Sequence, residues 1–149
     1  MTKTTGAITG IDATIYVSTD DVTYTDISGT ANSWSIKGGD RKAGDLHVLG
    51  ADTPIVRTGK LQMVDVTLKV VYSEIAAEGA DLINGYVSAN TPVYLRLRPK
   101  GDGAGKWQFK GGPGYFLTPS IPSVDAGNEK PVLIETHWVG PDMTQSAQT

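Results

Sequence analysis

The stretch Leu61–Tyr72, LQMVDVTLKVVY, decides the fold class. Its apolar residues recur at every second position: Val64, Val66, Leu68 and Val70. The positions between them are occupied by Asp65, Thr67, Lys69 and Val71. Alternation with a period of two is the pattern of a half-buried β-strand. The sequence therefore predicts one long strand over Leu61–Tyr72, which would span about 40 Å at ~3.3 Å per residue.

The segments on both sides of this stretch also favour β-structure. Shorter strands separated by turn residues are predicted over 12–17, 22–27, 34–36, 93–98, 106–110, 115–121 and 132–139. A single helix is predicted over Glu74–Asn90, because apolar residues recur there at helical spacing and Ser73 can act as its N-cap. Together these segments predict a mainly β chain, an antiparallel β-sandwich or barrel with one flanking α-helix.

The 149 residues are predicted to form a single domain with three less regular parts. Residues 1–10 are rich in Thr and Gly and are expected to form a flexible N-terminal arm, and residues 141–149 a polar C-terminal tail. Residues 38–60, GGDRKAGDLHVLGADTPIVRTGK, are expected to form a long charged loop. A loop of this length is often functional, so we expect either an exposed excursion or a segment that becomes ordered on a neighbouring molecule.

Composition excludes several functional classes. The chain has 13 Lys and Arg against 16 Asp and Glu, a net charge of −3 and a pI near 5.2, which disfavours a nucleic-acid or membrane-surface module. Cysteine is absent, which excludes disulfide scaffolds and thiol chemistry. No apolar run approaches the ~18 residues of a membrane helix, and residues 1–10 have no secretory apolar core. We therefore expect cytoplasmic synthesis and no membrane partner.

A weak metal-site pattern is present on the last predicted strand. Glu135 and His137 lie two residues apart, and Asp45 or His47 would have to supply a third ligand. A competent site needs at least three converging ligands, and the chain has only two histidines. The pattern is more typical of a solvated strand face, so no metal and no cofactor is predicted.

The glycine-rich segment Gly101–Lys106, GDGAGK, superficially matches a phosphate loop. The phosphate-loop motif requires Ser or Thr after Gly-Lys and a helix behind it, whereas Trp107 and a predicted strand follow here. A hairpin loop is therefore predicted. With no G-x-S-x-G motif and few histidines, no catalytic residues are predicted and the chain is not expected to be an enzyme.

A local group of basic residues lies just before and after this loop, interleaved with aromatic ones. Its members are Arg96, Arg98, Lys100, Lys106 and Lys110, with Tyr94, Trp107 and Phe109. On a β-sheet such a group could bind single-stranded nucleic acid by stacking and by phosphate contacts. The acidic total favours the alternative, a hairpin with a charged solvent face and aromatic residues in the core.

Several stretches, taken in order, resemble the tail tube (major tail) proteins of long-tailed bacteriophages. The pieces are Ile15–Asp20 (IYVSTD), Tyr24–Ser28 (YTDIS), Gly38–Arg41 (GGDR), Gly44–Asp45, Thr53–Ile55 (TPI), Gly59–Lys60, Leu68–Tyr72 (LKVVY), Pro92–Arg96 (PVYLR), Pro99–Gly101 (PKG), Asp125–Gly127 (DAG), Pro131–Glu135 (PVLIE) and Pro141–Thr144 (PDMT). The resemblance extends from about residue 11 to residue 144, which is most of the chain.

The resemblance implies a structural virion protein that is not an enzyme. Six copies would close into a ring, and stacked rings would form the hollow tail tube through which DNA passes to the host as transient, non-specific cargo. The implied partners are further copies of the chain, a tape-measure protein, a tail terminator and tail tip or baseplate proteins. The implied location is the phage tail, after synthesis in the cytoplasm of the bacterial host. A tube protein like that of type VI secretion is an alternative within the same architecture.

Charged residues are the candidate contacts within such a tube. The residues predicted to contact neighbouring rings or subunits are Asp40, Arg41, Asp45, Asp52 and Arg57. The residues predicted to face the lumen are Asp65, Lys69 and Glu135. An alternative of another class, a β-sandwich binding module, would use Trp34, Trp107 and Trp138 as a sugar-binding platform.

Overall fold

The computed structural model describes residues 10–119, 121–127 and 129–149. In chain order its elements are a short 3-10 helix η1 (Gly10–Asp12), β1 (Thr14–Ser18), β2 (Thr25–Asp26), β3 (Ala31–Gly38), β4 (Arg41–Leu46), β5 (Ile55–Leu61), β6 (Val64–Val71), α1 (Gly79–Ala89), β7 (Val93–Arg98), β8 (Trp107–Phe116), β9 (Leu133–Gly140) and β10 (Met143–Ala147). The predicted mainly β fold with one flanking helix is confirmed for this part of the chain.

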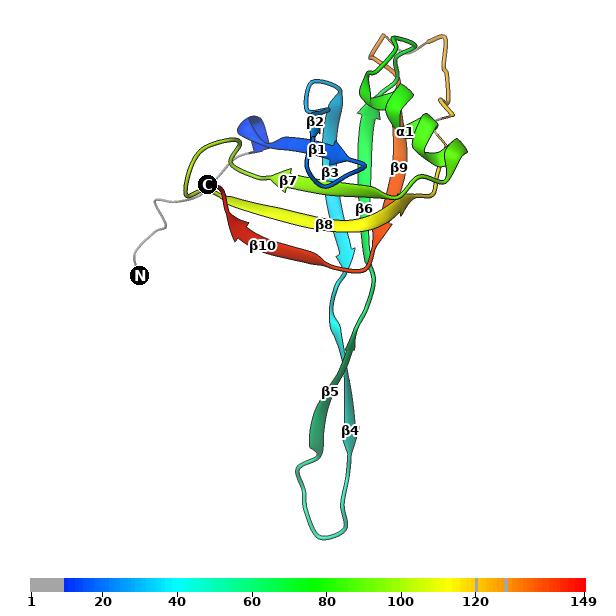
Figure 1. The fold of residues 1–149 in the computed structure, drawn as a ribbon. Helices are drawn as coiled ribbons and strands as arrows, with labels where there is room; N and C mark the ends of the chain where they lie inside the picture. Colours follow the sequence, from blue (N-terminus) through cyan, green and yellow to red (C-terminus); the bar gives the residue numbers. More distant parts are fainter. Residues whose placement is uncertain (1–9, 120, 128) are drawn as a thin grey trace, which may run out of the picture.

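Eight of the ten strands in the described part of the chain form one antiparallel sheet that bends through β8. The strand order is β2-β1-β7-β8-β9-β6-β3, with β10 also pairing with β8. Residues 107–111 of β8 pair with β10 and residues 109–114 with β7, whereas its last two residues pair with β9. In Figure 1 the strands β1, β7, β8 and β10 run across the view while β3, β6 and β9 run along its height. The result is a sandwich of two crossed layers joined by β8.

The core lies between the two layers and follows the alternation seen in the sequence. On β6 the buried positions are Val64, Val66, Leu68 and Val70. On β7 they are Val93, Leu95 and Leu97. The helix adds Ile83, which is fully buried. Because each strand presents a second face to solvent, the same strands can hold the core together and display polar side chains outside.

Trp138 on β9 is the largest fully buried side chain, and its indole nitrogen donates a hydrogen bond to Val93 O at 3.0 Å. Glycines surround its ring. A Cβ added at Gly111, Gly114 or Gly140 would lie 3.0, 2.6 or 2.2 Å from the ring. The run Gly111-Gly-Pro-Gly114, expected from sequence to separate two strands, therefore lies inside β8, where small residues make room for Trp138.

The helix is shorter than predicted. It begins at Gly79 rather than Glu74, because Ser73 accepts a hydrogen bond from Ile75 N–H in a local turn and Ala77 has a φ of 65°. A Cβ at Gly79 would meet Thr30 Oγ1 at 2.3 Å, so the helix starts where its backbone packs closely against the body. The apolar spacing predicts too long a helix because it includes Ile75 in the apolar stripe, whereas Ile75 is exposed and not part of the core.

The predicted loop 38–60 and the predicted single strand Leu61–Tyr72 were both wrong in detail. β4 and β5 pair with each other as a two-stranded sheet, so most of the predicted loop is a β-hairpin, hereafter the hairpin arm (residues 40–61). The predicted strand is divided at Gln62–Met63 into the end of β5 and all of β6. Figure 1 shows the hairpin arm standing away from the sandwich.

The two ends of the chain differ from each other. The C-terminal segment 141–149, predicted as a polar tail, contains β10, which pairs with β8, and Gln148 is buried. A polar composition did not prevent pairing, because the backbone of β10 supplies the hydrogen bonds that β8 needs on that edge. The predicted N-terminal arm lies outside the described residues apart from Gly10, which opens η1.

Candidate assembly surfaces

The hairpin arm is attached to the body by backbone hydrogen bonds at its base alone. Gly39 N–H donates to Met63 O at 3.2 Å, and Gln62 N–H donates to Asp40 O at 2.9 Å. Farther along, Arg41 Nη1 donates to Gly59 O at 3.2 Å. Every residue of the arm from Asp40 to Leu61 is exposed. A two-stranded hairpin without a covering layer is marginally stable in water, so this arm lacks the packing that normally stabilises such a ribbon.

Apolar side chains are exposed on both faces of this ribbon. Directly opposite residues share a face, so Leu46 and Ile55 lie on one face, and Val56, opposite Asp45, lies on the other. Leu46 is 64% exposed, Ile55 45% and Val56 60%. Contiguous exposed apolar surface marks interaction sites in soluble proteins. A partner that covered only one face would leave the other in water.

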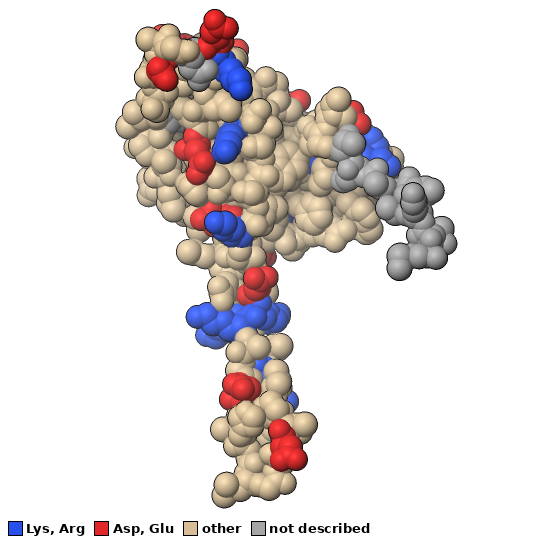
Figure 2. Space-filling model, turned by 180° about the vertical axis from the view of Figure 1, so that it is seen from behind, with Lys and Arg blue, Asp and Glu red and all other residues tan. Residues whose placement is uncertain are grey.

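The five residues predicted to make contacts between copies all belong to this arm. Arg41 and Asp45 are on β4, Arg57 is on β5, Asp40 is at the base and Asp52 is near the tip. Figure 2 shows basic side chains gathered in a band across the arm with acidic ones on both sides of it. The structure brings these residues together on one exposed element. Their role in contacts between copies stays a prediction.

The sheet has free edges that could continue into another molecule. β3 pairs with β6 on one side and has no partner strand on its other side among the described residues. At the opposite border, Tyr115 and Phe116 pair with β9 and Leu117 N–H donates to His137 O at 2.9 Å, whereas no strand among the described residues pairs with the other side of segment 115–118. Free edges of this kind are templates for strand pairing.

A cavity of about 380 Å³ opens between β3 and β10 at the base of the hairpin arm. Its lining includes Ile36 of β3, Phe109 of β8 and Met143 of β10. The two strand edges that border it are not hydrogen-bonded to each other. The sandwich is therefore open along this seam, next to the arm.

The three predicted lumen residues lie on one face. Asp65 and Lys69 alternate with the buried residues of β6, and Glu135 lies directly opposite Lys69 on β9. All three point away from the core, as do Thr67 and His137 of the neighbouring register pair. Whether this face, hereafter the β6–β9 outer face, lines a lumen stays a prediction.

The predicted metal pattern does not form a site. His137 Nδ1 lies 3.1 Å from Asp65 Oδ1, whereas Nε2 lies 3.6 Å from Glu135 Oε1. The two carboxylates contact opposite ring nitrogens and so do not converge on one point. Asp45 and His47, 3.9 Å apart, belong to the hairpin arm and not to this face. In the part of the chain that the structure describes, no group of three or more ligating side chains could hold a metal.

The predicted basic group is divided between a sheet face and a loop. Arg96 and Arg98 of β7 and Lys110 of β8 lie on the outer face of the crossed layer, hereafter the cation row, and Lys100 and Lys106 lie around the loop that follows β7. Lys106 Nζ donates to Asp102 O at 2.6 Å. Trp107 is 57% exposed, and Phe109 packs partly against the core.

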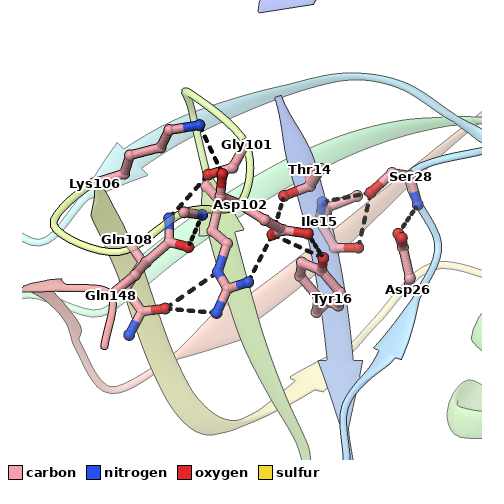
Figure 3. A network of polar contacts seen from close by, with 12 residues as sticks. Thr14, Ile15, Tyr16, Asp26, Ser28, Gly101, Asp102, Lys106, Gln108 and Gln148 are labelled. Atoms are coloured by element: carbon pink, nitrogen blue, oxygen red, sulfur yellow. Dashed lines mark hydrogen bonds and ion pairs between the residues drawn. The ribbon is translucent and has the colours of Figure 1, made fainter. Parts of the chain in front are cut away.

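Carboxylates and tyrosines organise the cation row. Arg98 Nη1 lies 2.6 Å from Asp102 Oδ1, and Tyr16 OH donates to Asp102 Oδ2 at 2.7 Å (Figure 3). The hydrogen bond from Tyr16 and then that from Arg98 lower the pKa of Asp102 below its ordinary value of 3.8. At the other end, the contact with Lys110 and then the hydrogen bond from Tyr24 lower the pKa of Asp21.

These contacts argue against a single-strand-binding face. Two of the three cations in the row already have a carboxylate from the same chain, and those carboxylates would repel phosphates. The aromatic rings beside them are turned toward Arg96, whose guanidinium carbon lies 3.9 Å from the Tyr24 ring centroid. They are not a free stacking platform.

The glycine-rich loop holds the end of the same chain instead of a phosphate. Gly103 N–H donates to Gln148 Oε1 at 3.0 Å, and Gln148 Nε2 donates to Gly101 O at 2.9 Å (Figure 3). Gly105 N–H donates to Gln148 O at 2.9 Å. The predicted hairpin loop is confirmed, and Gln148 is a structural residue that sequence reasoning missed. The loop's glycines signalled a close backbone approach but not its partner.

The alternative of a tryptophan platform is contradicted. Trp138 is fully buried in the core, whereas Trp107 is exposed on β8 and Trp34 packs partly against the core on β3. The three rings do not share one accessible surface.

None of the described helices is long and apolar enough to cross a membrane.

Comparisons with known proteins identify the fold. No protein-family model and no curated protein matches the sequence. Among solved structures, a chain of the sheath–tube complex of an extracellular contractile injection system in its extended state is 15% identical, with a TM-score of 0.68 over 97% of this chain and 94% of that one.

Two further solved structures are similar at the same level. A chain from the tail of an empty gene transfer agent (GTA) particle, computed with C6 symmetry, is 11% identical, with a TM-score of 0.67 over 96% of this chain and 100% of that one. A chain from the cap of the anti-feeding prophage is 11% identical, with a TM-score of 0.68 over 99% of this chain and 96% of that one. The chain therefore has a tail tube-like fold, as its sequence resemblance predicts.

Proposed function

We propose that this protein is the structural subunit of the tube of a phage-like or contractile injection particle, and that it acts by self-assembly and not by catalysis. The observation that carries the proposal is the hairpin arm. It is wholly exposed, and it carries apolar residues on both faces, including Leu46, Ile55 and Val56. An arm of this kind gains its packing from neighbouring molecules, so the isolated chain is one repeating unit of a larger assembly.

The free edges supply the second part of the proposal. Pairing of β3 of one copy with segment 115–118 of the next would continue the β3–β6–β9 layer from molecule to molecule. Closure of such a layer into a ring removes both edges. We propose rings of six, by analogy with the C6 symmetry of the similar gene transfer agent tail. The hairpin arm of each ring would then reach the next ring.

In this arrangement the β6–β9 outer face lines the lumen. Its charged residues Asp65, Lys69 and Glu135 are of both signs, so a passing polyanion would find no continuous cationic track to hold it. We propose DNA as transient cargo, a phage virion as the particle, and a tape-measure protein, a terminator and tip or baseplate proteins as partners. A tube of the type VI secretion kind is the alternative within the same architecture.

Deleting Arg41–Thr58 tests the proposal. The pairing of Gly38 with Val64 closes β3 onto β6 below the arm, so the shortened chain keeps a short turn and should fold as a monomer. Negative-stain microscopy of concentrated protein should show rings or tubes for the natural chain and neither for the deletion. Tubes of ordinary length from the deletion variant would refute the role of the arm.

A second variant distinguishes the loss of exposed apolar side chains from the loss of the whole hairpin arm. Replacing both Leu46 and Ile55 by Ser keeps the hairpin but removes the apolar pair from one face, and it should greatly reduce assembly. The matched control is Leu133→Ser, which changes an equally apolar residue, 43% exposed, on β9 outside the arm. If the control impairs assembly as much as the arm variant, the arm is not the specific contact.

A further inference from the structure

The cation row contains one cation without a counter-ion. Arg98 has Asp102 at 2.6 Å and Lys110 has Asp21 at 2.6 Å. Arg96 lies between these pairs on β7 and forms no ion pair with any described residue. Its Nε is the one buried side-chain nitrogen or oxygen, within the described part of the chain, that has no hydrogen-bond partner.

Two tyrosine rings hold the Arg96 guanidinium in place. Its central carbon lies 3.9 Å from the Tyr24 ring centroid and 4.8 Å from that of Tyr16. Both rings are themselves fixed, because Tyr16 donates its hydroxyl hydrogen to Asp102 and Tyr24 donates its own to Asp21. The guanidinium is therefore pre-oriented, and little conformational entropy would be lost when an anion binds it.

The chemistry of the site selects a carboxylate over other anions. A guanidinium binds a carboxylate through parallel charge-assisted hydrogen bonds. A nucleic-acid strand brings a phosphate at every nucleotide, and its neighbouring phosphates would meet Asp21 and Asp102 on either side of Arg96. A protein segment with a single carboxylate places one negative charge at Arg96, the one cation of the row without an ion pair, and brings no further negative charges next to Asp21 and Asp102. Asp26, one strand farther out, uses its own carboxylate to accept a hydrogen bond from Ser28 N–H.

We propose that Arg96, clamped between Tyr16 and Tyr24, is the anchor point for a carboxylate side chain of another protein that docks on the outer face of β1, β7 and β8. The position of the partner rests on the proposed function. If the β6–β9 outer face lines the lumen, the cation row belongs to the opposite layer of the sandwich and faces outward. The partner is then a protein that contacts the tube from outside and presents one carboxylate side chain to Arg96.

The guanidinium Nε–H signal of Arg96 in ¹H–¹⁵N spectra gives a direct readout. The probe is a short synthetic peptide that carries a single glutamate, titrated at constant ionic strength against the same peptide with glutamine in its place. We expect a saturable shift of the Arg96 signal with the glutamate peptide and none with the glutamine peptide. No shift, or equal shifts with both peptides, would overturn the proposal.

Variants test whether the binding belongs to this site. Arg96→Gln should weaken peptide binding by about tenfold or more, which corresponds to loss of one charge-assisted contact. The matched control Lys69→Gln removes a cation from the opposite face and should leave binding unchanged. Tyr24→Phe keeps the ring but removes its tie to Asp21, and it should weaken binding by a smaller factor, which gives a second test if Arg96→Gln does not fold.

Two competing anions complete the test. Inorganic phosphate and a single-stranded oligonucleotide should shift the Arg96 signal less than the glutamate peptide does, and a stronger effect of either one would overturn the choice of a carboxylate partner.

The same variants can be viewed by microscopy. Arg96→Gln should still form tubes. Failure of the natural chain to assemble would refute the proposed function. Failure of peptide binding alone would refute only the docking site.

Discussion

Trp138 determines which residues its neighbours on β8 and β9 can be. Its ring occupies the space where Gly114 and Gly140 would otherwise carry a side chain. The backbone angles at both glycines are ones that any residue adopts, so the requirement is for space alone. The glycine at position 140 thus follows from the buried indole, which is held by its hydrogen bond to Val93 O, and the glycine at position 114 follows from the indole together with the close approach of Val139 O.

Gly114→Ala should therefore destabilise the protein. Its Cβ would lie 2.4 Å from Val139 O and 2.6 Å from the Trp138 ring, and overpacking of this kind costs about 1–3 kcal/mol. Gly85→Ala is the matched control, because that position lies in α1 with nothing within 4 Å of the new Cβ, and it should stabilise by about 0.5–1 kcal/mol. Chemical denaturation measures both. Equal effects of the two substitutions would contradict the packing argument.

The carboxylate of Asp102 should make stability depend on pH. Its folded-state pKa is lowered by Tyr16 and Arg98, so its contribution is present above its ordinary pKa of 3.8 and is lost as the pH falls through the lowered folded-state value. Because its side chain is 57% exposed, we expect Asp102→Asn to cost only about 0.5–1 kcal/mol at neutral pH.

The difference between the natural chain and Asp102→Asn should shrink as the pH is lowered from about 5 into the acid range. Denaturant unfolding at a series of pH values measures it. Asp52→Asn, at the tip of the hairpin arm, changes a carboxylate without these partners and should leave the curve unchanged. A difference for Asp102→Asn that persists below the lowered pKa would show that charge is not the cause.

At the scale of the element, β10 pairs with β8, and the buried residue that follows the strand, Gln148, fixes its end to the glycine-rich loop. The Gln148 amide accepts a hydrogen bond from Gly103 N–H and donates one to Gly101 O, two backbone groups of the glycine-rich loop. Gln148→Ala should leave these groups without partners and cost about 1–3 kcal/mol. Gln145→Ala, on the exposed part of the same strand, is the control and should be nearly neutral.

Amide hydrogen exchange shows which residues lose protection in Gln148→Ala. The amides of β10 and of residues 101–106 should exchange faster in Gln148→Ala, whereas those of β6 should be unaffected. Uniform acceleration throughout the sheet would mean that the substitution lowers global stability and that β10 does not open as a local unit.

Elements with strict alternation were predictable and elements shaped by tertiary contact were not. β6 and β7 show their buried residues in the sequence, because a strand with one buried face must alternate. The start of α1 was misplaced because its limit is set by the close approach of Gly79 to Thr30. The hairpin arm was read as a loop because both of its faces are exposed, so burial imposes no alternation on it.

The candidate surfaces, too, were predictable only where a local sequence pattern reports them. Charged residues such as Asp40 and Arg57 could be assigned to one excursion from local composition alone. The stacking of Arg96 on Tyr24 joins residues far apart in sequence, and no local pattern reports it. The hydrogen bonds between Gln148 and the glycine-rich loop likewise become evident only from the fold, since Gly103 and Gly101 lie 45 and 47 residues away from Gln148 in the sequence.

At the scale of the whole molecule, the protein has two regions with very different packing. The sandwich has a continuous core with buried residues on β6, β7 and β9, whereas every residue of the hairpin arm from Asp40 to Leu61 is exposed. Few buried contacts and exposed backbone hydrogen bonds are the conditions for easy local opening. An arm that opens in the free subunit and is covered in the assembly would couple its ordering to polymerisation.

Hydrogen exchange of the free and assembled protein should therefore differ mainly in β4 and β5. We expect the amides of these strands to exchange rapidly in the monomer and to gain strong protection in tubes, because neighbouring copies exclude water from both faces of the ribbon. The amides of β6 should be protected in both states, which makes that strand the internal control. If β4 and β5 exchange as fast in tubes as in monomers, the arm is not an assembly contact, and the free edges of β3 and of segment 115–118 would have to hold the copies together without it.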